Sequence, residues 1–143
     1  MDADNSLSLW FSILYRYRKN YLMKKLERYG VIGGYPYMIL AIHKNAGTNQ
    51  EQISNILKTD KAAVTRAVKK LEKEDYILRE PDLSDKRAYR VTLTPKAEAV
   101  VPEIRKALQE WEQIAVAGIP EDMLPVLRQY VKQMSDNAVA FQM

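Results

Sequence analysis

Cysteine is absent from the 143-residue sequence, and histidine occurs once. Without thiols the chain can form no disulfide bond, no thiolate metal site and no switch based on thiol oxidation. A single histidine leaves little for metal coordination. We therefore expect neither a metal nor any other cofactor.

Long apolar runs and catalytic motifs are also missing. No apolar stretch approaches the roughly 18 residues that are needed to cross a bilayer. The beginning of the chain, 1–4, is acidic where a signal peptide would be basic. We expect a cytoplasmic protein with no membrane partner. The sequence offers no nucleophile–base arrangement, no phosphate-cradling glycine loop and no metal cluster, so we expect no enzymatic activity.

Hydrophobic residues make up 47% of the chain, which suffices for the core of one compact domain. The net charge of +4 hints at a polyanionic partner, and its distribution is more informative than its sum. Residues 1–29 carry six Lys and Arg against three Asp and Glu, and residues 58–96 carry eleven against seven. Residues 97–143 carry four against seven, so the basic excess lies in the first two thirds of the chain.

Apolar residues at steps of three and four predict six helices, and alternating residues predict one β-hairpin between the fourth and fifth helices. The strands are expected at 76–79 and 89–93, joined by a polar loop at 81–87. The helices are expected from Leu7 to Arg28, from Tyr35 to a turn at Asn45, after Thr48, from Asp60 to near Glu74, from Thr94 nearly to Gly118, and after Pro120.

Several helix ends carry recognisable signals. The run 48–51 fits a capping box in which the Thr48 hydroxyl caps the third helix. Asp60 and Thr94 are expected to cap the fourth and fifth helices. Asp75 is expected in the left-handed conformation that usually requires glycine. Pro125 predicts a short initial turn and a kink before the main part of the last helix.

A short capped helix, a tight turn, a basic amphipathic helix and a charged hairpin follow one another in the order of a winged helix-turn-helix. The second helix of such a pair enters the major groove, so it needs small residues for close approach and longer donors for base edges. We expect Arg66 to read guanine, and Lys61 and Lys69 to contact phosphates. Alternatively, these charges are an ordinary solvated helix face. The expected recognition residues are Lys61, Ala62, Ala63, Thr65, Arg66 and Lys69.

The tip of the hairpin is the second candidate DNA contact. Arg87 can enter a minor groove if Asp85 or Asp82 holds its guanidinium in place. Alternatively, the loop is only a charged turn. The expected wing residues are Asp85, Lys86 and Arg87.

Two segments at this spacing, 60–73 and 82–94, resemble the recognition helix and the wing signature of the MarR family of bacterial transcription regulators. The resemblance covers almost the full chain. It implies a homodimer whose N- and C-terminal helices interdigitate, with each wing in a minor groove and each recognition helix in the adjacent major groove. Large apolar helix faces, more than one small lobe could bury, agree with a dimer.

Four positions depart from the family pattern. Asp75 stands where the family often has glycine, and Ser84 stands where it often has arginine. Ala62 and Ala63 replace Ser or Thr, which favours methyl contacts with thymine over hydroxyl hydrogen bonds. The Ser84 departure puts one wing contact in doubt.

The expected architecture is therefore mainly α with a small β-hairpin wing, in a single domain covering 1–143. A winged helix-turn-helix lobe (35–95) lies between dimerisation helices (1–29 and 96–143). We expect a sequence-specific transcription regulator that binds a pseudo-palindromic operator in double-stranded DNA. Repression is the commoner outcome in the family. The residues expected at the DNA backbone are Thr48, Asn49 and Gln50.

Members of this family commonly release DNA on binding small, often aromatic, anions in a crevice between the dimer helices and the DNA-binding lobe. The absence of cysteine rules out the peroxide-sensing branch, which leaves an organic ligand or no ligand. Packing of tyrosines in the dimer core, and a capping or packing role for the single histidine, are the alternatives. The crevice candidates are Trp10, Arg16, Tyr17, Tyr35, Tyr37, His43 and Trp111.

A winged-helix module that binds protein and no specific DNA is the competing function. Such a module has no need of both a basic recognition face and Arg87. The presence of both therefore favours DNA binding.

Overall fold

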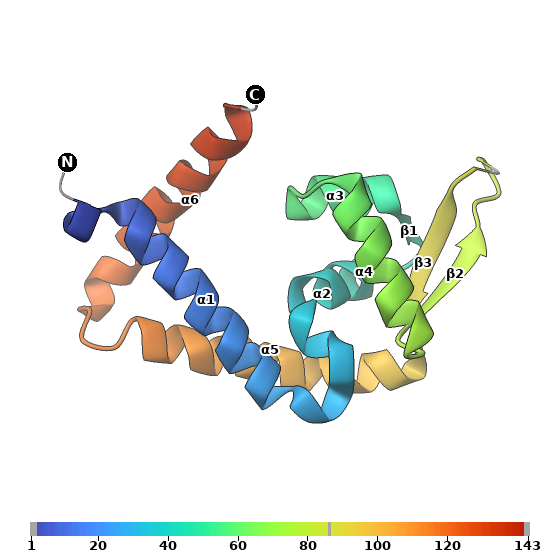
Figure 1. Ribbon diagram of the computed structural model, residues 1–143, viewed down its shortest axis with the longest axis horizontal. Coiled ribbons are helices and arrows are strands. Elements are labelled where there is room, and N and C mark those ends of the chain that lie inside the picture. The colour runs from blue at the N-terminus through green and yellow to red at the C-terminus, as the bar shows by residue number, and fades with distance from the viewer. Residues whose placement is uncertain (1–2, 86, 142–143) are drawn as a thin grey trace. The chain divides into compact units, whose positions relative to one another are not determined.

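The computed structural model describes residues 3–85 and 87–141. Helices dominate the chain, and a β-hairpin follows the fourth α-helix, as the sequence predicts (Figure 1). The elements in chain order are η1 (a 3-10 helix, Ala3–Asn5), α1 (Leu7–Lys25), η2 (a 3-10 helix, Glu27–Gly34), α2 (Pro36–Lys44), β1 (Thr48–Asn49), α3 (Gln50–Leu57), α4 (Lys61–Lys73), β2 (Ile77–Pro81), β3 (Tyr89–Leu93), α5 (Pro95–Ala115), η3 (a 3-10 helix, Glu121–Met123) and α6 (Leu124–Ala140).

The chain divides into two compact units, one ending at Trp111 and the other beginning at Glu112. The first unit holds α1 to α4, the sheet and most of α5. The second holds the end of α5, η3 and α6. The hydrophobic core of buried side chains belongs to the first unit. Its largest fully buried members are Leu26, Ile32, Ile39, Ile42, Ile53, Leu71, Ile77 and Ile104.

The first helix ends earlier than expected, at Lys25, and continues into η2. Within η2, Gly30 adopts φ 67°, which an L side chain rarely takes. A Cβ at Gly30 would lie 2.6 Å from Oε2 of Glu74, and that oxygen accepts a hydrogen bond from the Val31 amide at 3.0 Å. Glycine at this position therefore lets the segment after α1 dock on the end of α4.

Helix α3 begins one residue later than expected. Its N-cap is Asn49, whose side chain accepts from the Gln52 amide at 2.8 Å while Gln52 Oε1 accepts from the Asn49 amide at 3.0 Å. The predicted capping box of Thr48 and Glu51 is therefore wrong by one position. Thr48 lies in β1 instead, where its backbone pairs with Val91.

Helix α4 follows the prediction closely. Asp60 Oδ1 accepts from the Ala63 amide at 2.7 Å, which confirms the predicted N-cap. One face is buried, and it consists of Val64, Ala67, Val68 and Leu71. Asp75 follows the helix with φ 62°, which confirms its left-handed conformation. The helix thus turns its polar face outward.

The sheet has three antiparallel strands in the order β1-β3-β2. The predicted hairpin is confirmed, with Ile77 opposite Leu93 and Pro81 opposite Tyr89. The third strand, β1, was not predicted because two residues are too short for an alternating pattern. Just before it, Gly47 has φ 79°, and a Cβ there would lie 2.5 Å from the guanidinium of Arg90.

The ends of α5 and α6 agree with their sequence signals. The Thr94 hydroxyl oxygen accepts from the Ala97 amide at 3.2 Å, which confirms this cap. Helix α5 stops at Ala115, a little before the expected end, and Gly118 follows with φ 85°. A 3-10 turn then precedes α6, as Pro125 in its first turn predicts. No helix in the described part of the chain is long and apolar enough to cross a membrane.

Candidate nucleic-acid interface

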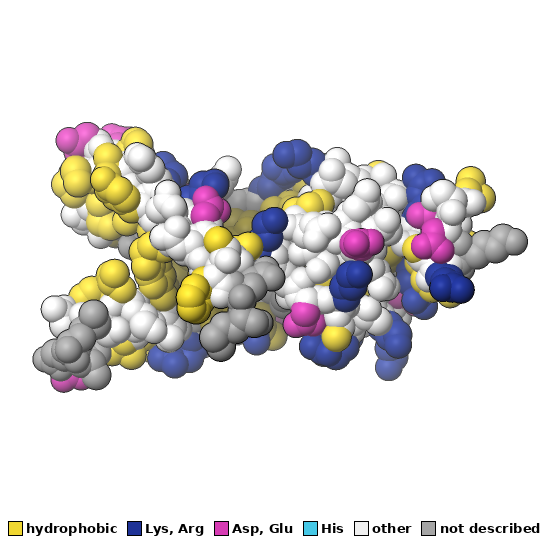
Figure 2. Space-filling model, turned by 90° about the horizontal axis from the view of Figure 1, so that it is seen from above, with side chains coloured by type: hydrophobic (Ala, Val, Ile, Leu, Met, Phe, Trp, Pro, Cys, Tyr) yellow, Lys and Arg dark blue, Asp and Glu magenta, His cyan; other side chains and the backbone are white. Residues whose placement is uncertain are grey.

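The polar face of α4 presents the basic residues that the sequence singles out. Lys61, Ala62, Arg66 and Lys69 are all exposed on it. Lys61 Nζ lies 4.0 Å from Glu51 Oε1, but both side chains are well solvated, so the pair holds the lysine only weakly. Lys and Arg side chains surround this lobe (Figure 2). The face is therefore free to meet a polyanion.

Two other predicted recognition residues are placed differently from the exposed four. Ala63 is half-buried and lines a pocket on the inner side of the helix. The Thr65 hydroxyl lies 2.9 Å from the Lys61 carbonyl oxygen and 3.1 Å from Gln50 Oε1. Thr65 thereby links α4 to the start of α3, a packing contact that no sequence pattern marked.

The start of α3 brings together the three residues expected at the DNA backbone. Thr48 is 4% exposed, and its hydroxyl donates to Gln52 Oε1 at 2.9 Å. This burial keeps the hydroxyl away from any phosphate. Asn49 and Gln50 are partly exposed at the helix N-terminus, where backbone amides and the helix dipole favour an anion.

The wing loop is shaped by two aspartates. Asp82 accepts from the amide of Ser84 at 2.9 Å and from its hydroxyl at 2.7 Å, and Asp85 accepts from the Arg87 amide at 3.0 Å. The hydrogen bonds from Ser84, the backbone one above all, lower the pKa of Asp82. Both carboxylates are thus engaged in forming the turn.

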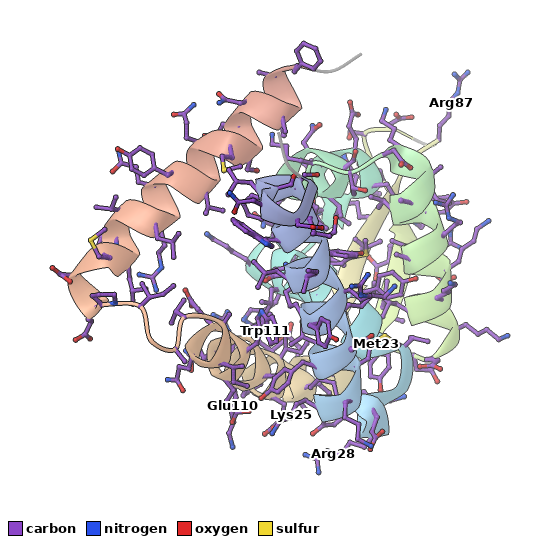
Figure 3. The ribbon with its side chains drawn as sticks, turned by 60° about the vertical axis from the view of Figure 1, so that its left-hand side comes forward. Met23, Lys25, Arg28, Arg87, Glu110 and Trp111 are labelled. Carbon is purple, nitrogen blue, oxygen red and sulfur yellow. The ribbon has the colours of Figure 1, made fainter. Side chains whose placement is uncertain are left out.

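Arg87 is exposed, and its side chain extends away from the lobe (Figure 3). The expected clamp on its guanidinium differs in the structure, because Asp85 binds the Arg87 backbone and Asp82 binds Ser84. An aspartate side chain is short, so it binds the backbone amide two residues further on more readily than it binds the end of a long arginine side chain. Lys86, the third predicted wing residue, lies outside the described residues.

Two arginines of the sheet make contacts that the sequence did not reveal. Arg79 Nε donates to Glu72 Oε2 at 2.8 Å, and Arg90 Nε donates to the Gly47 carbonyl oxygen at 3.0 Å. Both partners are far away in sequence or in another element, so no local spacing signals them. These arginines join the wing to the rest of the lobe.

A pocket of about 620 Å³ lies on the inner side of α4 within the first unit. Tyr35 and Tyr37 are the crevice candidates that line it. Tyr15, Arg18 and Lys19 of α1 line it as well, and so do Ala63, Ala67 and Lys70 of α4. The pocket thus touches both α1 and α4.

Arg18 is the distinctive polar group of this pocket. Its guanidinium lies 5.4 Å from the ring centre of Tyr15 and 5.3 Å from that of Tyr37. Its Nε is buried and has no hydrogen-bond partner among the described residues. A buried donor of this kind gains free energy when an acceptor reaches it.

The other crevice candidates are placed elsewhere. Trp10 and Tyr17 are exposed on α1, and the Arg16 guanidinium lies 5.9 Å from the Tyr17 ring centre. His43 Nδ1 lies 2.7 Å from Glu98 Oε2, an exposed hydrogen bond between α2 and α5. The structure therefore does not bring the seven candidates together at one site.

Trp111 belongs to a cluster where α1 and α5 meet (Figure 3). Its ring centre lies 5.7 Å from that of Tyr21, whose hydroxyl donates to Glu110 at 3.2 Å. Lys25 Nζ lies 3.5 Å from the same Glu110 carboxylate. These contacts join the two helices. Within 3–85 and 87–141, no group of three or more His, Cys, Asp and Glu side chains is arranged to hold a metal ion.

Comparison of the sequence with known proteins points to one family. The MarR family model matches residues 37–89, from α2 to the start of β3. The HTH-type transcriptional regulator BilQ of Clostridioides difficile (strain CD3) is 30% identical over 107 residues, which cover 75% of this chain and 72% of that protein. The family-model match includes α3, α4 and β2.

Comparison of the structure gives the same result over nearly the whole chain. A MarR transcriptional regulator from Methanosarcina mazei Go1 is 32% identical with a TM-score of 0.86, covering 95% of this chain and 98% of that one. A putative MarR family regulator from Listeria monocytogenes, solved in complex with a 26mer DNA, has a TM-score of 0.85 at 22% identity, covering 95% and 91%. The second likeness shows the fold.

Proposed function

The chain belongs to the MarR family of transcription regulators, and from this premise we propose that it is a sequence-specific DNA-binding repressor that acts as a homodimer. The observation that carries the proposal is the exposed face of α4, where Arg66 and Lys69 are solvated beside a wing whose Arg87 extends outward. A recognition helix and a wing meet adjacent grooves of one duplex. The Listeria protein of this fold, crystallised with DNA, supports the proposal.

Base reading is assigned to the first half of α4. Ala62 presents only a methyl group, so the helix can approach the groove floor closely and contact a thymine methyl. Arg66 lies one turn further along, and its planar fork matches the two acceptors of guanine. Lys61 and Lys69 supply charge to the flanking phosphates without reading sequence.

Two further contacts complete the proposed half-site. Arg87 enters the minor groove, whose negative potential favours arginine. Asn49 and Gln50 meet a phosphate at the start of α3, where the first amides of the helix are unpaired within it. Phosphate contacts from two sides fix the register in which Arg66 meets the bases.

A second copy of the chain is the proposed partner for the apolar helix faces. Trp10 and Leu14 of α1 are more than 40% exposed, although both are large and apolar. In α6, all of whose residues are described, no side chain is buried, and Leu127, Tyr130 and Met134 are exposed. Such faces, yellow in Figure 2, bury their area against an identical surface in a two-fold dimer.

The pocket beneath α4 is the proposed site for a small aromatic anion that releases DNA. Aromatic rings line it together with three cationic side chains, Arg18, Lys19 and Lys70, and no acidic residue is among its lining residues. A planar anion matches that lining by stacking and by pairing with Arg18. Because Ala63, Ala67 and Lys70 belong to α4, an occupant that contacts α4 biases its position.

Fluorescence anisotropy on duplexes that tile the region upstream of the gene tests the proposal. We expect one preferred duplex that contains a pseudo-palindrome with half-sites about one helical turn apart, and an affinity that falls steeply with salt. Equal and weak binding to every duplex at physiological salt would overturn the claim of sequence-specific binding. It would favour a winged-helix module that binds protein.

A further inference from the structure

Arg79 lies on β2 and joins three elements through one side chain. Its Nε donates to Glu72 Oε2 at 2.8 Å, and Glu72 lies in the last part of the recognition helix α4. Its guanidinium carbon lies 4.9 Å from the ring centre of Tyr89, on β3. Because Pro81 is the residue opposite Tyr89, Arg79 reaches this ring diagonally across the two strands.

The contact is better shielded than the ion pair that joins the starts of α3 and α4. The side chains of Arg79 and Glu72 are 26% and 36% exposed, whereas those of Lys61 and Glu51 are 70% and 68% exposed. Solvated pairs contribute little, and a shielded charged hydrogen bond with a stacked guanidinium contributes more. The hydrogen bond that Arg79 donates to Glu72 also raises the pKa of Arg79.

Arg79 is the third of the five residues of β2, so it ties the wing to α4 between the base at Ile77 and the loop. At about 3.3 Å per residue, the five residues of β2 span roughly 16 Å, and a rotation of about 10° at the base moves the far end by about 3 Å. A hydrogen bond between Arg87 and its groove would not survive a displacement of about 3 Å. The base of the wing therefore controls whether Arg87 reaches its groove while α4 occupies the next one.

We propose that Arg79 is a positioning residue that braces the wing against the recognition helix through Glu72 and Tyr89, and that it makes no contact with DNA itself. The inference rests on the proposed DNA binding. It adds that α4 and the wing contact DNA as one rigid unit, and that Arg79 sets the angle between them.

A double-mutant cycle on the preferred duplex tests the brace. Arg79→Met keeps the apolar stem and removes the guanidinium, and we expect both it and Arg87→Ala to weaken binding by about tenfold. The double variant should bind within about threefold of Arg79→Met, because a displaced wing no longer presents Arg87. Arg66→Ala should keep its full effect in the Arg79→Met background. General destabilisation would not separate Arg87 from Arg66 in this way.

Arg28→Met is the matched control, because the Arg28 guanidinium also lies over a tyrosine ring, 4.8 Å from that of Tyr29, but in η2. It should leave affinity unchanged. Glu72→Gln keeps the volume of the side chain and removes only its charge, so it replaces Arg79→Met if that variant does not fold. We expect Glu72→Gln to weaken binding less than Arg79→Met does, and we expect its effect on affinity to be lost when Arg87 is also replaced by alanine. The proposal would be overturned if the loss of affinity in the double variant equalled the product of the losses in Arg79→Met and Arg87→Ala. Equal affinities of Arg79→Met and Arg28→Met would overturn it as well.

Hydrogen exchange of the protein without DNA separates this inference from the proposed function. In Arg79→Met the amides of 77–80 and 89–93 should exchange about tenfold faster than in the wild type, with those of α2 and α3 unchanged. Unchanged exchange in the wing refutes the brace even when the duplex is bound. Faster exchange in Arg79→Met, together with a wild type that prefers no duplex, supports the brace and refutes DNA recognition instead.

Discussion

Arg66 and Lys69 lie one turn apart on the same exposed face, so they provide a matched test of base reading against phosphate contact. Arg66→Ala removes one guanidinium, and with it one proposed bidentate contact to guanine, from each half-site. A bidentate contact contributes about 1–3 kcal/mol of discrimination, which is roughly 5- to 150-fold for each half-site. Lys69→Ala removes one phosphate contact from each protomer. The salt slope should then fall by about 0.9 per contact, and so by about 1.8 for the dimer.

The assay is anisotropy on the preferred duplex and on duplexes with single base-pair changes, each measured over a salt series. We expect Arg66→Ala to bind the substituted and original duplexes almost equally at one position in each half-site. Lys69→Ala should keep the full discrimination while it weakens every duplex by a similar factor. Identical behaviour of the two variants would refute the assignment of base and phosphate roles along α4.

Three further predictions concern the scaffold that holds this face. Gly30→Ala forces a side chain into a left-handed φ and against the Glu74 carboxylate, and we expect it to lower the free energy of unfolding by roughly 1–3 kcal/mol in urea titrations; an unchanged midpoint would contradict the docking of η2 on α4. Asp82 should titrate below its ordinary pKa of 3.8 by carbon-detected NMR, and the contribution of its turn to stability, present at higher pH, should be lost only as pH falls through that lowered pKa; Ser84→Ala should raise the midpoint, and no change would exclude its hydroxyl as a cause. Tyr76→Phe should cost about 0.5–1.5 kcal/mol, because the buried hydroxyl donates to a backbone carbonyl; equal stability of the two proteins would show that this bond contributes nothing.

The periodic parts of the fold could be predicted from the sequence because their causes are local. The apolar stripe of α4 and the alternation of β3 depend on residues within a few positions of one another. Asp60, Thr94 and Asp75 act on amides or φ angles at their own helix ends. These elements have their expected places.

The differences arise where several local choices compete or where tertiary contacts decide. Thr48 and Asn49 are both good caps, and pairing of Thr48 with β3 leaves the cap to Asn49. The segment after α1 bends at Gly30, whose non-helical backbone (φ 67°) interrupts the 3-10 helix, and the next residue, Val31, then donates its amide to Glu74. Both partners, β3 and Glu74, lie about 40 residues away in the sequence, so a local sequence pattern does not reveal them.

The site was predictable in its exposed charges but not in its support. A basic face and a charged loop can be read from spacing, whereas the link from Arg79 to Glu72 depends on how the hairpin folds back along α4. The pocket has the same character, since Arg18 meets Tyr37 only after α1 and α2 pack together. Sequence patterns therefore locate the exposed basic surface and miss the tertiary contacts that support it.

The central claim is that a dimer reads two half-sites through paired recognition helices and wings. It is tested most directly by inserting base pairs between the half-sites of the preferred duplex and measuring affinity at physiological salt. An insertion of about 5 base pairs turns one half-site to the opposite side of the helix, and we predict that binding then falls to the level of a scrambled duplex. Binding that is indifferent to this insertion would contradict recognition by a two-fold dimer.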